Sequence, residues 1–220
     1  MKRILLAWSS GKDCAWALHL LRQRAEVEVI GLLTTVNEPF QRVSMHGVAR
    51  ALLERQARAA GLPLWLVELP WPCPNEVYEA RMAQACARAA QAGVDAVAFG
   101  DLFLEDVRAY RQRQMAATGL EPLFPLWGED TARLARAMIA GGQRALVTCV
   151  DPQRLPPRFC GREFDRRFLS ELPPGVDACG EHGEFHTFVY AAPAFAEPIA
   201  CETGETLERD GFVFTEVRPV

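Results

Sequence analysis

The sequence contains almost no lysine. Lys2 and Lys12 are its only two, and arginine carries the rest of the side-chain positive charge. The net charge is -4 and the pI is near 5.7, so the composition lacks the broad basic footprint of a nucleic-acid-binding protein. Small-molecule chemistry is therefore favoured, and nucleic acid is not expected as a partner. Because the chain nearly avoids lysine yet places Lys12 beside a glycine, Lys12 is a candidate functional residue.

Long hydrophobic runs and paired cysteines are also missing. No stretch approaches the roughly 20 apolar residues that a membrane-spanning helix needs. The apolar run after Met1 meets Lys12 and Asp13 too soon to be the core of a signal peptide. Seven cysteines lie between Cys14 and Cys201 without a C-x-x-C pair, a pattern that indicates neither a disulfide framework nor a zinc site. We expect a reducing, cytoplasmic location and no membrane partner.

The order of apolar segments predicts an α/β fold. Hydrophobic residues make up 50% of the chain and charged residues 24%, and 220 residues suffice for one α/β domain with a small appendage. Short runs rich in Val, Ile and Leu alternate with segments of helical period, as in a parallel sheet covered by helices. We predict a doubly wound, mainly parallel five-stranded sheet within residues 1–150. Its strands are expected at residues 3–8, 28–36, 64–69, 96–99 and 144–150, and its helices at residues 13–24, 48–60, 75–92, 105–118 and 131–140.

The pattern changes after residue 150. Proline pairs appear, and the regular alternation of strand and helix ends. We predict a small C-terminal α+β extension over residues 151–220. Its elements are expected to be a short helix at 164–172, a strand at 183–190 and a hairpin of residues 199–202 and 212–217.

The segment Ser9-Ser10-Gly11-Lys12-Asp13-Cys14 follows the first predicted strand and opens the first helix. Sheets of this kind bind ligands at the carboxyl ends of their strands. A helix N-terminus offers unpaired N–H groups, Gly11 permits a close approach of the backbone, and Lys12 adds a positive charge. The segment therefore predicts a phosphate cradle. An equal alternative is an ordinary turn in which Ser10 or Asp13 only caps the helix.

This segment resembles the S-G-G-x-D-S signature of the PP-loop, or N-type ATP pyrophosphatase, superfamily. A Walker A loop is excluded, because Leu6 stands where its first glycine belongs. Ser10 replaces the second signature residue and Cys14 the last, and a thiol is a weaker hydrogen-bond donor than a hydroxyl. The resemblance implies an adenine nucleotide alpha hydrolase-like fold and cleavage of ATP to AMP and pyrophosphate. The ATP-binding residues that it implies in this segment are Ser9, Ser10, Gly11, Lys12, Asp13 and Cys14.

Three segments further along resemble the diphthine-ammonia ligase family within this superfamily. Residues 98–101 with the arginine-bearing helix through 110–113 are similar to its G-D strand end and arginine-rich helix. Residues 124–127 are similar to its P-L-W segment, and residues 177–188 contain its long G-E-x-G-E-F-H-T signature. Order and spacing extend the resemblance over about residues 3–190. The best-known activity of that family is amidation of diphthine on elongation factor 2.

The resemblance implies an ATP-binding PP-loop domain at residues 1–150 and an acceptor-substrate region at 151–220. It adds His46, within Ser44-Met45-His46, and Gly100 and Asp101 to the nucleotide site. Asp13 and Asp101 are candidate Mg²⁺ ligands, because magnesium prefers oxygen ligands. A loop residue for His46, a helix cap for Asp101 and a solvated side chain for Arg111 or Arg113 remain alternatives. The predicted acceptor-binding residues are Arg111, Gly180, Glu181, Gly183, Glu184, His186 and Thr187.

The alternation of a strand places Glu184 and His186 on one face. A Glu-His pair can bind a polar acceptor or move a proton, although a merely solvated strand face has the same pattern. Lys12 would stabilise charge developing on the phosphates. We therefore predict Lys12, Glu184 and His186 as the catalytic residues.

The predicted reaction is adenylation of an acceptor carboxylate by Mg²⁺-ATP, with release of AMP and pyrophosphate and formation of an amide with ammonia. The acceptor is a small molecule or is borne by a protein. Two alternatives stay open: an RNA-modifying PP-loop enzyme that uses Cys149 and Cys160, and a non-catalytic ATP-binding regulator. The sequence leaves the oligomeric state open, with a homodimer as one option.

Overall fold

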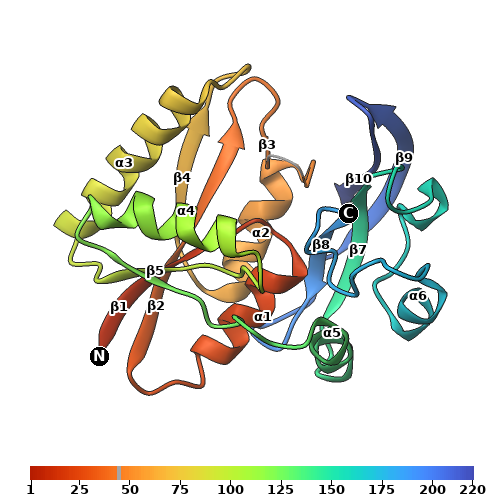
Figure 1. Ribbon diagram of the computed structural model, residues 1–220, viewed down its shortest axis with the longest axis horizontal. Coiled ribbons are helices and arrows are strands. Elements are labelled where there is room, and N and C mark those ends of the chain that lie inside the picture. The colour runs from red at the N-terminus through yellow and green to blue at the C-terminus, as the bar shows by residue number, and fades with distance from the viewer. Residues whose placement is uncertain (44–45) are drawn as a thin grey trace.

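The computed structural model describes residues 1–43 and 46–220, which form two sheets side by side (Figure 1). In the first sheet, five strands run parallel in the order β4-β2-β1-β5-β6, and the short β3 pairs antiparallel with the end of β2. The strands are β1 (Lys2–Ala7), β2 (Val27–Asn37), β3 (Arg42–Val43), β4 (Leu64–Leu69), β5 (Ala96–Ala98) and β6 (Glu121–Leu123).

Helices cover both faces of this sheet, as the doubly wound prediction requires. Alternate residues of β1 point to opposite faces. Ile4 and Leu6 pack in the cluster that contains α1 and α2, whereas Leu5 packs in the cluster that contains residues of α3 and α4. All three side chains are fully buried, as expected of a central parallel strand. The helices are α1 (Lys12–Leu21), α2 (Arg50–Ala60), α3 (Asn75–Gln91), α4 (Glu105–Ala116) and α5 (Thr131–Ala140).

The second sheet is antiparallel, with the order β8-β7-β10-β9. The predicted hairpin forms, but its first strand covers Cys201–Arg209 instead of residues 199–202. It turns at Asp210-Gly211, where both residues have positive φ, as in the two-residue turns favoured by hairpins. The remaining elements are β7 (Arg144–Val150), η1 (Pro157–Phe159), α6 (Arg166–Glu171), β8 (Phe185–Ala191), β9 (Cys201–Arg209) and β10 (Phe212–Pro219).

One strand assignment was wrong. Residues 144–150, predicted as the fifth parallel strand of the first sheet, form β7 and pair antiparallel with β8 and β10. The fifth parallel strand is instead β6, which is three residues long and contains Pro122. β7 is buried at all but its first residue, and a buried apolar run indicates a strand without indicating its partner.

The two sheets share one hydrophobic cluster. Leu6 and Leu18 from the first part of the chain belong to the same cluster as Val147 and Phe188 from the second sheet. A division of the chain at residue 150 stays a prediction. None of the helices in the described ranges is long and apolar enough to cross a membrane.

Candidate functional site

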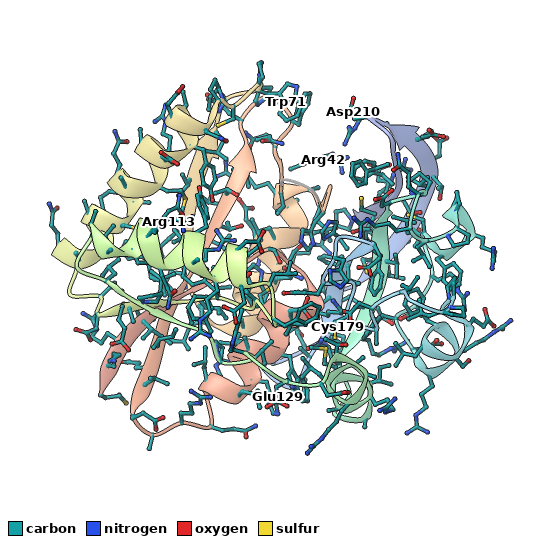
Figure 2. All side chains as sticks on the ribbon, in the orientation of Figure 1. Arg42, Trp71, Arg113, Glu129, Cys179 and Asp210 are labelled. Carbon is teal, nitrogen blue, oxygen red and sulfur yellow. The ribbon has the colours of Figure 1, made fainter. Side chains whose placement is uncertain are left out.

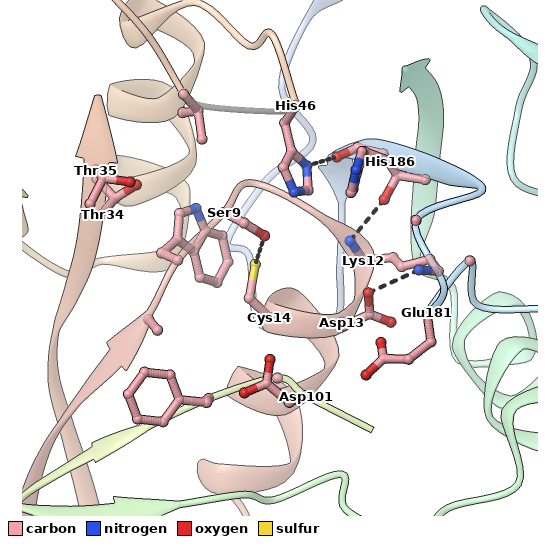
Figure 3. A pocket seen from close by; sticks show the side chains of 18 of the residues that line it. Ser9, Lys12, Asp13, Cys14, Thr34, Thr35, His46, Asp101, Glu181 and His186 are labelled. Atoms are coloured by element: carbon pink, nitrogen blue, oxygen red, sulfur yellow. Dashed lines mark hydrogen bonds and ion pairs between the residues drawn. The ribbon is translucent and has the colours of Figure 1, made fainter. Parts of the chain in front are cut away.

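A cavity of about 390 Å³ opens where β1, β2 and β5 end (Figure 3). The strand order reverses between β1 and β5, and ligands of doubly wound sheets bind at such a switch point. Its volume lies in the range of small-molecule sites. Most of the predicted site residues line it: Ser9, Lys12, Asp13, Cys14, His46, Gly100, Asp101, Arg111, Gly180, Glu181, Gly183, His186 and Thr187.

The loop after β1 reaches α1 through a tight turn. Gly11 is the N-cap residue of α1. Ser10 Oγ and Asp13 Oδ1 have no hydrogen-bond partner among the described residues, and Asp13 Oδ2 accepts from Lys12 Nζ, so the alternative in which Ser10 or Asp13 caps the helix was wrong. A Cβ atom on Gly11 would lie 2.8 Å from His46 Cε1, which explains the need for glycine. The Cys14 thiol donates to the Gly11 carbonyl at 3.1 Å and lies 3.6 Å from Ser9 Oγ. Ser10 has φ 72°, and its buried hydroxyl has no partner among the described residues.

The second sheet holds this loop in place. The Lys12 amide donates to Thr187 Oγ1 at 3.0 Å, and the Val189 amide donates to the Ser10 carbonyl at 3.0 Å. Gln56 of α2 donates to the carbonyls of Ser10 and Val189, and it accepts from Trp8 Nε1. Gln56 was not predicted, because nothing marks a buried glutamine within a helix sequence.

The Lys12 side chain points toward the second sheet. Its buried Nζ donates to Asp13 Oδ2 at 2.9 Å and to the Cys179 carbonyl, and it lies 5.3 Å from the centre of the Phe185 ring. Burial opposes the charge, but Asp13 and the other acidic neighbours outweigh it and raise the pKa of Lys12. The ammonium is therefore charged and already paired, and its catalytic role stays a prediction.

Three carboxyl groups lie near one another at the cavity (Figure 3). Asp13 Oδ1 and Asp101 Oδ2 are buried and accept no hydrogen bond within residues 1–43 and 46–220. Glu181 accepts from the Leu102 amide at 2.8 Å. Burial raises the pKa of all three groups, that of Glu181 to about 7, with Asp13 and Asp101 contributing to the shift of Glu181.

These oxygens suit a hard cation. No group of three or more His, Cys, Asp or Glu side chains in the described part of the chain is arranged to hold a metal ion by itself. Mg²⁺ at nucleotide sites usually takes only one or two carboxylates and completes its shell with water and phosphate. The donor-free oxygens of Asp13 and Asp101 fit that requirement.

Two histidines meet at the edge of the cavity. The rings of His46 and His186 lie 4.8 Å apart, and His46 Nδ1 lies 3.0 Å from the Thr187 carbonyl oxygen. Because that oxygen can only accept, Nδ1 carries the proton and Nε2 is free to accept. Burial lowers the pKa of His46 to about 4 and that of His186 to about 3. Both rings are neutral near pH 7, so His186 is a weak base as placed here.

Glu184 does not line the cavity. It precedes β8, is 3% exposed, and accepts from the Asp177 amide at 3.0 Å. The neighbouring turn needs glycine, because Gly180 has φ 70° and a Cβ atom there would lie 2.8 Å from the Phe185 carbonyl oxygen. The observed contact of Glu184 shapes this turn, and its catalytic role stays a prediction. Glu181 is the glutamate of the signature that reaches the cavity.

The remaining predicted residues differ in whether they contact the loop, line the cavity or face solvent. Gly100 packs against the loop, because a Cβ atom on it would lie only 3.2 Å from the Cys14 amide nitrogen. Arg111 Nε lies 3.6 Å from Asp101 Oδ2, whereas Arg113 is exposed (Figure 2). Ser10 and Gly11 shape the loop without lining the cavity. Ser44 and Met45 lie outside the described residues.

The end of β2 contributes two residues that were not predicted. Thr34 and Thr35 line the cavity, and Thr34 Oγ1 is buried without a partner among the described residues. A pair of threonines closing an apolar strand at the ligand-binding edge of the sheet was a usable signal. Cys149 and Cys160, in contrast, do not line the cavity, and burial raises the pKa of both thiols, that of Cys149 to about 12.

The curated relatives that the chain matches are diphthine--ammonia ligases. The chain is 32% identical over 129 residues to a diphthine--ammonia ligase of Danio rerio, covering 56% of this chain and 51% of the relative. It is 28% identical over 129 residues to the Homo sapiens diphthine--ammonia ligase, covering 56% of this chain and 48% of that protein. The chain spans about half the length of the curated relatives that it matches.

Family models account for most of the chain. The diphthamide synthase C-terminal domain matches residues 130–216. The diphthamide synthase N-terminal domain matches residues 1–122, which is more than half of the 220 residues. The chain therefore belongs to the diphthamide synthase family, as the PP-loop and G-E-x-G-E-F-H-T segments predicted.

Proposed function

We propose that the protein is a cytoplasmic ATP-dependent ligase that adenylates an acceptor carboxylate and joins it to ammonia. One observation carries the proposal: the loop at the N-terminus of α1 and the donor-free oxygens of Asp13 and Asp101 converge in one cavity at the switch point of the sheet. The names of the relatives, diphthine--ammonia ligases, indicate the same class of reaction. Residues 1–150 would bind ATP, and residues 151–220 would contribute to binding of the acceptor.

The loop residues would hold the triphosphate. Ser9, Lys12, Asp13 and Cys14 line the cavity at the N-terminus of α1, and helix N-termini favour anions. Asp13 and Asp101 would bind Mg²⁺, which when bound neutralises phosphate charge. Thr34 and Thr35 would contact the nucleoside part of ATP, because they line the other side of the same cavity. The neutral His46 Nε2 can accept a hydrogen bond from the nucleotide.

The acceptor carboxylate would attack the α-phosphorus, so that a P–O bond forms to the acceptor and the bond to pyrophosphate breaks. Ammonia then attacks the acyl carbon, loses a proton, and displaces AMP. Preorganised amide donors stabilise the charge that develops at phosphorus. Since Glu181 reaches the cavity and Glu184 does not, we assign the ammonia proton to Glu181.

The sulfur-transfer alternative finds no support in the site. Cys149 is fully buried in β7, and the Cys160 thiol donates to the Val213 carbonyl at 3.3 Å. Catalytic thiols need a low pKa and access to substrate, and both of these have a raised pKa. Replacing Cys160 with serine should therefore leave AMP formation unchanged.

Pyrophosphate–ATP exchange tests the proposal. The protein is incubated with Mg²⁺-ATP, labelled pyrophosphate and a panel of carboxylates that includes diphthine on elongation factor 2, and label entering ATP is measured. Carboxylate-dependent exchange, followed by AMP release when ammonia is added, is expected. Asp101→Asn should abolish the exchange, whereas Asp210→Asn at the exposed hairpin turn (Figure 2) should not. ADP and phosphate as products would contradict the proposal, as would exchange that is absent with every carboxylate.

A further inference from the structure

Two arginines on α4 form a pair that the ATP site leaves unexplained. Arg108 and Arg111 are three residues apart and therefore lie on one face of the helix. Arg111 lines the cavity beside Asp101. Arg108 lies outside the cavity and forms no ion pair with any described residue, and its observed side-chain contacts are with aromatic rings.

Aromatic rings fix both guanidinium groups. Arg108 Cζ lies 4.5 Å from the centre of the Trp127 ring and 5.3 Å from that of Phe124. Arg111 Cζ lies 5.0 Å from the centre of the Phe99 ring. Phe99 and Phe124 stack with their centres 5.8 Å apart, so the arginines and the rings form one continuous row. This row joins the segment after β5, the helix α4 and the segment after β6.

The stacking leaves hydrogen-bond donors free. A guanidinium that lies over a ring presents its N–H groups in its own plane, in a fork that matches an oxyanion. Arg108 Nε and Arg111 Nε are both buried, and neither has a hydrogen-bond partner within the described ranges. The 3.6 Å between Arg111 Nε and Asp101 Oδ2 is too long for a hydrogen bond. A buried donor without an acceptor costs free energy, so a ligand that supplies oxygen acceptors would stabilise both arginine side chains.

We propose that Arg108 and Arg111 bind a carboxylate of the acceptor substrate. This inference rests on the proposed function. The triphosphate of ATP is the other source of oxyanions, but the cradle at Ser9–Cys14 serves it, and Arg108 lies outside that cavity. Arg111 at the cavity wall and Arg108 beyond it mark the side on which the acceptor lies. The P-L-W segment thereby gains a role, because Trp127 supports Arg108.

Binding to the ATP-free protein tests the site directly. The full chain is labelled with ¹⁵N-arginine, and the Nε–Hε signals are followed during titration with glutarate, with its neutral diamide, or with pyrophosphate. Glutarate should shift the signals of Arg108 and Arg111 to saturation, and the diamide should shift neither. Pyrophosphate should shift Arg111 and leave Arg108 unchanged. An Arg108 signal that ignores glutarate, or that follows pyrophosphate equally well, would overturn the proposal.

Substitutions supply the matched comparison. Arg108→Lys keeps the charge and the aliphatic stem but loses the planar fork, so glutarate should bind about tenfold to a hundredfold more weakly. Arg113→Gln, exposed on the same helix, should bind glutarate like the wild type. Equal binding by Arg108→Lys would refute the assignment. If Arg108→Lys fails to fold, the titration of the wild-type protein with glutarate and pyrophosphate still tests the proposal.

The two proposals fail in different ways. Glutarate binding at Arg108 without carboxylate-dependent exchange under any condition would leave the anion site standing and refute the ligase. Exchange with a KM for the carboxylate that Arg108→Lys leaves unchanged would leave the ligase standing and refute the role of Arg108. A raised KM for the carboxylate with an unchanged KM for ATP is the expected result.

Discussion

Ser10 is the residue at which the loop between β1 and α1 stores conformational strain. Its φ of 72° lies in the left-handed region, which costs a residue with a side chain about 1–2 kcal/mol. Its hydroxyl is fully buried and has no partner among the described residues, at a cost of roughly 1–3 kcal/mol. Two effects oppose the gain from replacing Ser10 with glycine. The greater freedom of glycine in the unfolded chain costs about 0.5–1 kcal/mol, and the lost packing of the small side chain costs about 0.8 kcal/mol. With the middle of each range, Ser10→Gly should stabilise the fold by about 2 kcal/mol.

Thermal unfolding followed by circular dichroism measures this effect. For a chain of this size the melting temperature should rise by roughly 4–8 °C. Ser10→Ala is the matched control, because it removes the hydroxyl but keeps the left-handed strain, so its melting temperature should lie between those of the wild type and Ser10→Gly. The rise caused by adding ATP should be the same in all three proteins, because the Ser10 side chain does not line the cavity. A melting temperature of Ser10→Gly at or below that of the wild type would refute the reasoning.

Three further predictions concern the contacts around this loop. Thr187→Val removes the acceptor of the Lys12 amide, so stability to urea should fall by about 1–3 kcal/mol and AMP formation should fall with it, whereas Thr203→Val on the exposed strand β9 should change neither. Cys14→Ser should preserve or raise turnover, because a hydroxyl is the stronger donor to the Gly11 carbonyl; a large loss of AMP formation would contradict this. His186 has a folded pKa of about 3 and an unfolded pKa of about 6.5, so the unfolded chain binds more protons, and stability should fall as pH drops from about 6.5 toward 3. Glu181, with its pKa raised to about 7, acts in the opposite direction between pH 4.5 and 7, so urea unfolding of His186→Gln is compared with the wild type at each pH. As pH falls, the free energy of unfolding of the wild type should drop toward that of His186→Gln or below it. A difference in free energy of unfolding that stays constant with pH would contradict the assignment.

The sequence was a good guide wherever the signal was local. The loop Ser9–Cys14 could be located because a glycine, a lysine and a helix start follow directly on a buried strand, and all of these lie within a few residues. Gly180 and Gly183 were equally visible, and the structure shows the positive φ that each adopts. The hairpin at Asp210-Gly211 is a further local feature, since two residues set the turn.

Long-range partners were not visible in the sequence. Strand alternation placed Glu184 beside His186, but the turn before β8 directs Glu184 to the Asp177 amide and brings Glu181 to the cavity instead. A period of two specifies the faces of a regular strand and ends where the strand ends, and β8 begins only at Phe185. Gln56 was missed for a similar reason, because its three partners come from other parts of the chain.

The amino-acid sequence alone was enough to predict the α/β class, the loop of residues 9–14 and the family, because these depend on short patterns of hydrophobicity, glycine and charge. The tertiary structure alone decided that β7 belongs to the second sheet, that Lys12 is already paired, and that Arg108 rests on Trp127. Each of these depends on which distant segments pack together. Such packing depends on the burial of whole faces of helices and sheets and on the pairing of buried polar groups. The sequence of a single segment does not specify it.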